Sequence, residues 1–280
     1  MDVVIEVDGL RKTYGGFTAV DGVDLEVVRG EVFGLLGPNG AGKTTTVEIC
    51  EGYRKRSGGE VRVLGEDPQH PSPDWRCRIG LVLQASQASE ELTVAECITH
   101  FGSFYPAPRT TDEVLAQVGL EAKRDDRAGK LSGGQQRRLD VALGIVGRPE
   151  LLFLDEPTTG FDPEARRQFW DLIRALQAEG TTIVLTTHYL DEAEALADRV
   201  AVLAGGRIKA LGDPATLGGR ADATATVTWI DDDGHHELRT AEPTRTVAEL
   251  GQRFGGEVPH LTVRRPTLED IYLSLIGDHT

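Results

Sequence analysis

The glycine-rich stretch at residues 37–45, Gly-Pro-Asn-Gly-Ala-Gly-Lys-Thr-Thr, constrains this chain more than any other, because it has the spacing G-x-x-x-x-G-K-[ST]. An apolar run, Val32–Leu36, comes before it, and a helical pattern begins at about Lys43. Glycines let backbone N–H groups approach a phosphate closely, and the helix adds the positive end of its dipole. A chance glycine-rich turn is the competing interpretation, but the order strand, loop, helix argues against it. The stretch predicts a nucleotide-binding protein.

Two side chains of this loop add charge and metal-binding chemistry. Lys43 can neutralise the β- and γ-phosphate oxygens, and the Thr44 hydroxyl can hold Mg²⁺. Backbone groups of the glycines and their neighbours can complete the phosphate cradle. The loop residues predicted to bind the nucleotide are Gly37, Asn39, Gly40, Gly42, Lys43, Thr44 and Thr45.

Composition and charge argue against several classes of protein. The 280-residue chain has a net charge of −15 at pH 7, and an acidic surface repels phosphate backbones, so nucleic acid is not expected as the main partner. Its three cysteines are scattered without metal-ligand spacing. The first residues lack the pattern of a signal peptide, and no apolar run approaches the ~20 residues that a membrane-spanning helix needs. We therefore expect a soluble, cytoplasmic chain that reaches a membrane only by docking to another protein.

The order of the expected elements predicts an α/β core with an α-helical insertion at about residues 85–130. Continuous apolar runs indicate strands of a sheet that is covered on both faces. The expected strands are residues 3–7, 19–27, 31–36, 61–64, 79–83, 151–154 and 181–187. The expected helices are residues 43–51, 94–104, 112–118, 136–146, 163–179 and 190–198. In the last helix, Asp191, Glu192 and Glu194 are expected on the solvated face.

A change of composition after residue 217 predicts a second, smaller α+β domain. An Asp-Asp-Asp-Gly turn at residues 231–234 indicates a β-hairpin. The expected elements are, in order, strands at residues 223–230 and 236–240, a helix at 246–254, a strand at 260–263 and a helix at 268–276. We therefore expect a nucleotide-binding domain at residues 1–217 and a small C-terminal accessory or regulatory domain at residues 218–280.

Two adjacent carboxylates, Asp155 and Glu156, directly follow the apolar run at residues 151–154. Ligands bind outside the carboxyl ends of strands in open α/β sheets, so these side chains are expected near the phosphate loop. Asp155 can hold Mg²⁺ through its water shell, and Glu156 can polarise a water that attacks the γ-phosphate. A strand that simply ends at the surface is the alternative, and the phosphate loop in the same chain argues against it.

A second candidate phosphate-binding device, Ser132-Gly133-Gly134-Gln135, precedes an expected helix. A hydroxyl, bare backbone amides and a helix dipole converge there. One nucleotide does not need two such loops far apart in sequence, so this loop is predicted to read the γ-phosphate of a nucleotide held by a second copy of the chain. The result would be a dimer with two nucleotides between its subunits. An ordinary helix cap is the alternative interpretation.

The run from Leu131 to Pro163 resembles the signature motif, Walker B strand and D-loop of the ATPase subunits of ABC transporters. The phosphate loop, Gln84 and His188 fall in the order that this family shows, and the resemblance covers about residues 2–217. It implies a P-loop ABC ATPase core, in which a mixed sheet is combined with helices and a helical subdomain. It also implies a competent hydrolase, with ATP and Mg²⁺ as cofactors.

The resemblance implies further roles for single residues. Tyr14 would stack on the adenine ring, Gln84 would contact Mg²⁺ and the lytic water, and Asp162 would contact the opposite subunit. Glu156 would be the general base, and His188 would sense the γ-phosphate and position that base. Taken alone, Tyr14 and His188 could each be a core side chain; their places beside strand ends favour the functional roles.

Residues 265–272, Arg-Pro-Thr-Leu-Glu-Asp-Ile-Tyr, are similar to the tail of bacterial ATPases that serve ABC-2-type exporters, including multidrug and daunorubicin-type efflux pumps. The similarity implies efflux of a drug, lipid or other hydrophobic compound, powered by ATP-driven dimer closure and hydrolysis-driven opening. The implied partners are a separate multi-spanning permease, at the inner face of the cell membrane, and a second copy of the chain. An importer ATPase, or a soluble ABC ATPase that acts on ribosomes or DNA, is the alternative. The sequence does not name the cargo.

Overall fold

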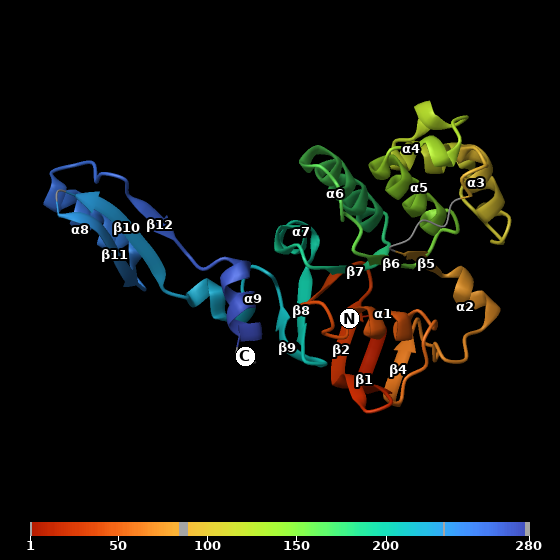
Figure 1. Cartoon of the computed structure of the whole chain (residues 1–280), viewed down its shortest axis with the longest axis horizontal. Helices are drawn as coiled ribbons and strands as arrows, with labels where there is room; N and C mark the ends of the chain where they lie inside the picture. The colour runs from red at the N-terminus through yellow and green to blue at the C-terminus, as the bar shows by residue number, and fades with distance from the viewer. Residues whose placement is uncertain (1, 84–88, 232, 278–280) are drawn as a thin grey trace. The chain divides into compact units, whose positions relative to one another are not determined.

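The computed structural model describes residues 2–83, 89–231 and 233–277, and it divides into two compact units, Met1–Leu211 and Gly212–Thr280 (Figure 1). The sequence predicts the boundary between residues 217 and 218, whereas the structure divides the chain between residues 211 and 212. The 3-10 helix η3 (Leu217–Asp222) packs with α9 (Leu268–Gly277) inside the second unit. A Cβ on Gly218 would lie only 2.6 Å from the side chain of Ile271 in α9. Each unit has a hydrophobic core of its own.

The first unit is built on a six-stranded sheet with the strand order β5-β6-β7-β3-β8-β9. Its strands are β3 (Val32–Leu36), β5 (Ile79–Val82), β6 (Leu151–Asp155), β7 (Thr182–Thr187), β8 (Arg199–Ala204) and β9 (Arg207–Gly212). From β5 to β8, neighbouring strands run parallel. Every residue of β3 and β7 is buried, as continuous apolar runs predict for a sheet covered on both faces. Strands β8 and β9 are additions to the strands that the sequence predicts.

An antiparallel sheet with the order β2-β1-β4 forms the other β-structure of this unit. It comprises β1 (Val3–Tyr14), β2 (Phe17–Val28) and β4 (Gly58–Val63), and the helices near it in sequence are α1 (Lys43–Cys50) and α2 (Pro73–Cys77). Leu10 of β1 and Val27 of β2 share a buried cluster with Phe33 of β3 and Ile49 of α1. This cluster joins the antiparallel sheet to the central sheet. β1 and β2 are longer than predicted, because polar residues on their outer face interrupt the apolar pattern.

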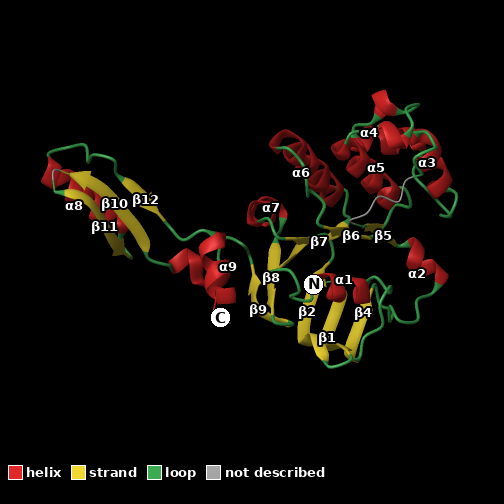
Figure 2. Cartoon of the chain, in the orientation of Figure 1, coloured by secondary structure: helices red, strands yellow, loops and turns green. Residues whose placement is uncertain are grey.

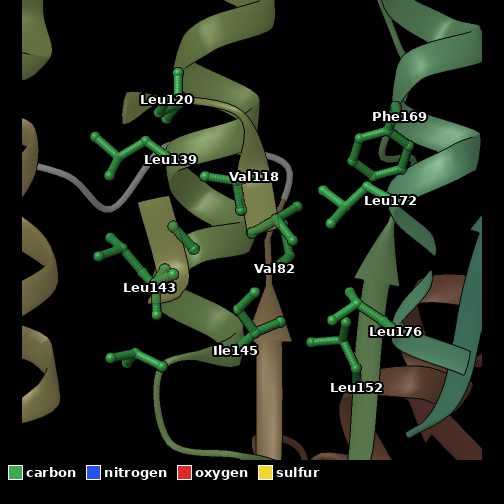
Figure 3. Packing of buried hydrophobic residues seen from close by; sticks show 14 of the residues in the cluster. Val82, Val118, Leu120, Leu139, Leu143, Ile145, Leu152, Phe169, Leu172 and Leu176 are labelled. Carbon is green, nitrogen blue, oxygen red and sulfur yellow. The ribbon is translucent and has the colours of Figure 1, made fainter. Parts of the chain in front are cut away.

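The remaining helices of the first unit share a second buried cluster with the central sheet (Figure 3). They are α3 (Val94–Gly102), α4 (Thr111–Val118), α5 (Gly133–Ile145), α6 (Pro163–Ala178) and α7 (Leu190–Leu196), together with the short 3-10 helix η2 (Ala128–Lys130). A further 3-10 helix, η1 (Glu121–Lys123), contributes no residue to the cluster. In Figure 3, Leu139 of α5, Val82 of β5 and Phe169 of α6 belong to this cluster. Helix α5 begins at residue 133 rather than at the predicted 136, because Ser132 caps it.

The second unit combines an antiparallel sheet with α-helices and with the 3-10 helix η3 (Figure 2). Its elements are β10 (Ala225–Asp231), β11 (Gly234–Thr240), α8 (Pro243–Phe254), β12 (Thr262–Arg264) and α9, and the sheet order is β11-β10-β12. This order of elements is the one that the sequence predicts. Val227 and Trp229 of β10 pack with Leu250 of α8 and with Val258, so α8 covers one face of the sheet.

Within residues 2–83, 89–231 and 233–277, every helix falls short of the length and apolarity that crossing a bilayer requires.

Candidate nucleotide site

Three neighbouring parallel strands bring predicted site residues to one edge of the central sheet. The phosphate loop follows β3, Asp155 ends β6, and His188 follows β7. In the register of the sheet, Thr187 lies opposite Leu36 of β3, and Thr186 lies opposite Asp155. Because β7 lies between β6 and β3, the segments that follow these strands are brought to one place. Open α/β sheets bind their ligands at such an edge.

The phosphate loop has a backbone that requires glycine at two positions. Gly42 has a φ of 104°, and a Cβ there would lie 2.5 Å from the carbonyl oxygen of Ala19. A Cβ on Gly37 would lie 2.2 Å from the carbonyl oxygen of Leu203. Gly42 is also the N-cap of α1, and as a glycine it has no side chain to occupy the first N–H groups of the helix. The loop therefore offers backbone donors and a helix dipole to an anion.

Lys43 points its ammonium group back into this loop. Its Nζ donates hydrogen bonds to the carbonyl oxygens of Gly37, at 2.7 Å, and Pro38, at 3.2 Å. The side chain is buried, which lowers the pKa of Lys43, whereas the negative charges of Glu156 and Asp155 act in the opposite direction. Lys43 of the phosphate loop therefore interacts electrostatically with Asp155, which ends β6, and with Glu156, which follows it.

Glu156 is held in an unusual backbone conformation at the end of β6. Its φ is 43°, in the left-handed region that non-glycine residues rarely adopt. The backbone N–H of Glu156 donates to the carbonyl oxygen of Thr186, at 3.1 Å, and lies 3.2 Å from the Thr186 hydroxyl oxygen. That hydroxyl in turn donates to the Asp155 carboxylate. Thr186 of β7 thus contacts both the carboxylate of Asp155 and the backbone N–H of Glu156, and the sequence reasoning missed this residue.

Glu156 and His188 form a pair that is suited to activating water. The Glu156 Oε1 lies 3.3 Å from the His188 Nδ1. The Glu156 side chain is 18% exposed and that of His188 is 41% exposed, so the pair is open on the histidine side. A carboxylate in such a place can accept a proton from water, and the imidazole can orient it. The structure thus brings together Lys43, Asp155, Glu156 and His188.

The Ser132–Gln135 segment forms a reciprocal helix cap at the start of α5. The Ser132 Oγ accepts a hydrogen bond from the Gln135 N–H, and the Gln135 Oε1 accepts one from the Ser132 N–H. The segment lines a polar groove of about 440 Å³ together with Gly160, Phe161 and Asp162, which follow the Walker B strand. Phosphate-loop residues are not among the residues that line this groove. Ser132, Gly133, Gly134 and Gln135 therefore form a separate surface of the first unit.

Comparison with known proteins agrees with this geometry. The family model for ABC transporters matches residues 20–159, half of the chain. The chain belongs to the ABC transporter family. As a member of this family it is an ATPase, because its members bind ATP and hydrolyse it to drive transport.

Two curated relatives of this ABC ATPase match nearly the whole chain. The daunorubicin resistance ATP-binding protein DrrA3 of Streptomyces coeruleorubidus is 38% identical, over 99% of this chain and 97% of that protein. The Nod factor export ATP-binding protein I of Rhizobium sp. (strain N33) is also 38% identical, over 98% of this chain and 97% of that protein. The match therefore includes the second unit.

Among solved structures, the chain resembles a dimeric, post-hydrolysis state of the ATP-binding cassette MJ0796 bound to ADP and Pi. The identity is 25%, the match covers 75% of this chain and 98% of that chain, and the TM-score is 0.67. This likeness agrees with the ABC ATPase fold of the first unit.

Tyr14 and Asp162, to which the family resemblance assigns roles, both lie at the ends of secondary-structure elements. Tyr14 ends β1 with 39% of its surface exposed, so it is not a core side chain, and the Lys12 ammonium lies 4.9 Å from the centre of its ring. Asp162 caps α6, because its Oδ1 accepts hydrogen bonds from the N–H groups of Glu164 and Ala165 at 2.9 and 2.8 Å. Gln84 lies outside the described residues.

Glu192 corrects one expectation about this ABC ATPase. It is completely buried, although the sequence reasoning assigns it to a solvated face. Glu192 lies one turn before Leu196 on α7 and next to Ala193, and both of these residues are also buried, so it shares the inward face of the helix. Burial raises the pKa of Glu192, while polar groups of Thr187 and of other neighbours lower it. A run of acidic residues did not reveal which of them faces inward.

Proposed function

We propose that this chain is the ATPase subunit of an ABC-2-type exporter. The observation that supports this most is the match to two export or resistance ATP-binding proteins over nearly the full length of all three chains. Because the match includes the second unit, the resemblance extends beyond the nucleotide-binding core that many transporters share. The proposed cargo class is a drug, lipid or other hydrophobic compound.

In the proposed reaction, Glu156 takes a proton from the attacking water and His188 holds that carboxylate in place. The 3.3 Å separation between the Glu156 Oε1 and the His188 Nδ1 supports this division of roles. Lys43 neutralises the β- and γ-phosphate oxygens, and Tyr14 offers an exposed ring to the adenine.

Mg²⁺ is the proposed metal of the site. Its preferred ligands are oxygens, and the edge of the sheet supplies the Thr44 hydroxyl and the Asp155 carboxylate. Asp155 ends β6 and the phosphate loop follows β3, and only β7 lies between these two strands in the sheet, which supports the closeness of the carboxylates to the loop. When bound, the metal would neutralise phosphate charge and orient the phosphate oxygens.

We further propose that two copies of the chain enclose two nucleotides. In that arrangement, Ser132, Gly133, Gly134 and Gln135 of one copy read the γ-phosphate on the other, and Asp162 adjoins the opposite subunit. The exposed groove of the first unit that these residues line supports the proposal. The dimeric state of the MJ0796 cassette is consistent with it. Hydrolysis removes the bridging phosphates, so the dimer opens.

The proposed partner is a separate multi-spanning permease that holds this subunit at the inner face of the cell membrane. The helical segment at about residues 85–130 is the proposed surface that transmits opening and closing. The second unit is proposed to serve as an accessory or regulatory domain in this assembly.

Affinity purification tests the proposed role. Tagged Glu156→Gln protein is purified with Mg²⁺ and ATP from detergent-solubilised membranes of its own host, with Lys43→Ala protein as the matched control. The expected result is recovery of an equimolar multi-spanning membrane protein, encoded with an efflux system, together with the Glu156→Gln protein. Recovery of a solute-binding protein with the permease would indicate an importer, and recovery of ribosomes or DNA factors would contradict the transport role.

A further inference from the structure

Arg137, on the second turn of α5, has a buried guanidinium group that donates to three backbone carbonyl oxygens. Its side chain is 9% exposed. The Nε donates to the carbonyl oxygen of Pro157 at 3.0 Å, and the Nη2 donates to that of Asp155 at 2.7 Å. The Nη1 donates to the carbonyl oxygen of Leu83, which follows β5. One side chain of α5 therefore binds the ends of two parallel strands.

The carbonyls of Asp155 and Pro157 lie on either side of Glu156 in the chain. Holding the Asp155 carbonyl fixes the peptide plane that precedes Glu156, and the Pro157 carbonyl fixes the plane that follows the proline. Because the proline ring already restricts φ at residue 157, little rotational freedom remains at Glu156. The left-handed φ of 43° at Glu156 is a conformation that needs such external support.

Backbone carbonyl groups compensate the positive charge of the buried Arg137 guanidinium. A buried cation requires compensation, and here three carbonyl dipoles supply it directly. The nearest carboxylate oxygen of Asp140 lies 4.0 Å away. Burial lowers the pKa of Arg137, whereas the charges of Asp140, Asp155 and Glu192 raise it. A planar guanidinium can reach three separated acceptors at once, which a lysine or glutamine side chain cannot do with the same geometry.

We propose that Arg137 is a positioning residue for ATP hydrolysis, which holds the backbone around Glu156 so that its carboxylate faces His188. The residue acts through Glu156, so the inference rests on the role proposed for that carboxylate. Ser132 caps α5 and Arg137 lies five residues later on that helix, so Arg137 also connects the Ser132–Gln135 segment to Glu156. A shift of α5 would thereby move the reactive carboxylate.

Arg109 provides a matched control. Its side chain is also 9% exposed, and its Nη1 donates to the carbonyl oxygen of Ile145 at the other end of α5. Its Nη2 donates to Glu179, beyond the end of α6. Arg109, which lies between α3 and α4, is thus an equally buried arginine that contacts the other end of α5, and Arg109→Gln removes it without touching the segment around Glu156.

The test compares Arg137→Gln, Arg137→Lys and Arg109→Gln in the full chain by single-turnover ATP hydrolysis, fluorescent-nucleotide affinity and Tm. We expect Arg137→Gln to lower the hydrolysis rate at least about 10-fold while the nucleotide Kd changes less than about twofold. Arg137→Lys keeps the positive charge but loses the planar guanidinium that reaches three carbonyl oxygens. Its hydrolysis rate should lie between those of Arg137→Gln and the wild type. Arg109→Gln should lower Tm and leave the rate within about twofold of wild type.

Glu156→Gln separates failure of this inference from failure of the role proposed for Glu156. If Arg137 acts through Glu156, adding Arg137→Gln to Glu156→Gln changes the residual rate less than about twofold. Near wild-type hydrolysis by Arg137→Gln, with Glu156→Gln inactive, overturns the positioning role alone. Near wild-type hydrolysis by Glu156→Gln overturns the role of the carboxylate itself. If Arg137→Gln does not fold, Arg137→Lys provides the test. A wild-type hydrolysis rate in Arg137→Lys would show that the planar guanidinium is not needed to position Glu156.

Discussion

Each of the two units contains a carboxylate–histidine pair, and the surroundings of the two pairs differ. In the first unit, Glu156 lies 3.3 Å from His188 at the edge of a parallel sheet. In the second, the Asp231 Oδ1 lies 2.7 Å from the His236 Nε2 across a hairpin, and the imidazole stacks on Trp229 with ring centres 5.1 Å apart. The first pair is coupled to a lysine of the phosphate loop, whereas the second closes a turn. In the proposed function, catalysis is assigned only to the pair that lies beside the anion-binding loop.

The two sheets explain why the pairs differ. Parallel strands that are buried on both faces leave only their ends available for chemistry, so reactive groups gather there. The antiparallel sheet of the second unit has α8 on one face, and its other face carries polar side chains such as Thr226, Thr228 and Arg264. Its polar groups are spread along the strands. Among the residues of this unit that the structure describes, none belongs to a phosphate loop.

Replacing Lys43 by alanine should have the largest effect on nucleotide binding. Lys43 is the cation of the phosphate loop that interacts with Glu156 of the first pair. The β- and γ-phosphate charge would lose its buried cation, so the affinity for ATP should fall by about 100-fold or more. Fluorescent-nucleotide titration measures this loss, and an unchanged Tm confirms that the fold is intact. An affinity for ATP near that of wild type would show that the phosphate-loop assignment is wrong.

Replacing His188 by alanine should lower single-turnover hydrolysis by about 10-fold or more, because Glu156 loses the group that orients it. The nucleotide Kd should change little, since the phosphate loop is untouched. His236→Ala is the matched control in the second unit, and its hydrolysis rate should stay within about twofold of wild type. An equal loss of hydrolysis rate in His188→Ala and His236→Ala would contradict the assignment of ATP hydrolysis to the first pair alone.

A pH-dependent stability effect is expected at Glu51, which lies just after α1. Burial, followed by the charges of Asp155 and Glu48, raises the pKa of Glu51 from 4.5 to about 7. The folded protein thus holds this proton more tightly than the unfolded chain does. The resulting stabilisation is complete below pH 4.5 and is lost as the pH rises through about 7.

Glu51→Gln removes this titration and should therefore be more stable than wild type at pH 8, by an amount on the order of 3 kcal/mol. At pH 5 the two proteins should differ much less. Thermal unfolding at the two pH values measures the difference. If the difference in stability between Glu51→Gln and the wild type is the same at pH 5 and pH 8, the raised pKa of Glu51 is contradicted.

The smallest effect is expected for His236→Ala. The hydrogen bond from His236 is the main cause that lowers the pKa of Asp231 below its ordinary 3.8. The Asp231 contribution to stability is therefore present above that value and is lost as the pH falls through the lower pKa of the folded state. The variant should lose about 2 °C in Tm at pH 7, with a smaller difference below pH 3.8. Thermal unfolding of His236→Ala and the wild type from below pH 3.8 to pH 7 tests whether the Tm difference grows as the pH rises.

The sequence predicts the α/β core and the position of Asp155, Glu156 and His188 well, because apolar runs mark buried strands and the ends of parallel strands meet at one edge. It does not predict the left-handed φ of Glu156 or its bonds to Thr186, because these depend on contacts between strands that lie 30 residues apart.

The sequence also did not predict that the charged side chains of Arg137 and Glu192 are buried, for a related reason. Arg137 stands beside another arginine, and Glu192 stands in an acidic run, so local pattern gives no sign of which side chain faces inward. Only the packing of α5 and α7 against the sheet decides it. The site is thus predictable where it depends on strand ends, and not where it depends on the supporting contacts.

The most direct test of the distinction between the two pairs is single-turnover hydrolysis of ATP by full-length Glu156→Gln and Asp231→Asn proteins. Each variant removes one carboxylate charge with little change of shape. Glu156→Gln should keep bound ATP intact, with a rate lowered by about 100-fold or more, while Asp231→Asn should hydrolyse it within about twofold of the wild-type rate. A wild-type rate in Glu156→Gln, or an equal loss in both variants, would contradict the assignment of ATP hydrolysis to the Glu156–His188 pair.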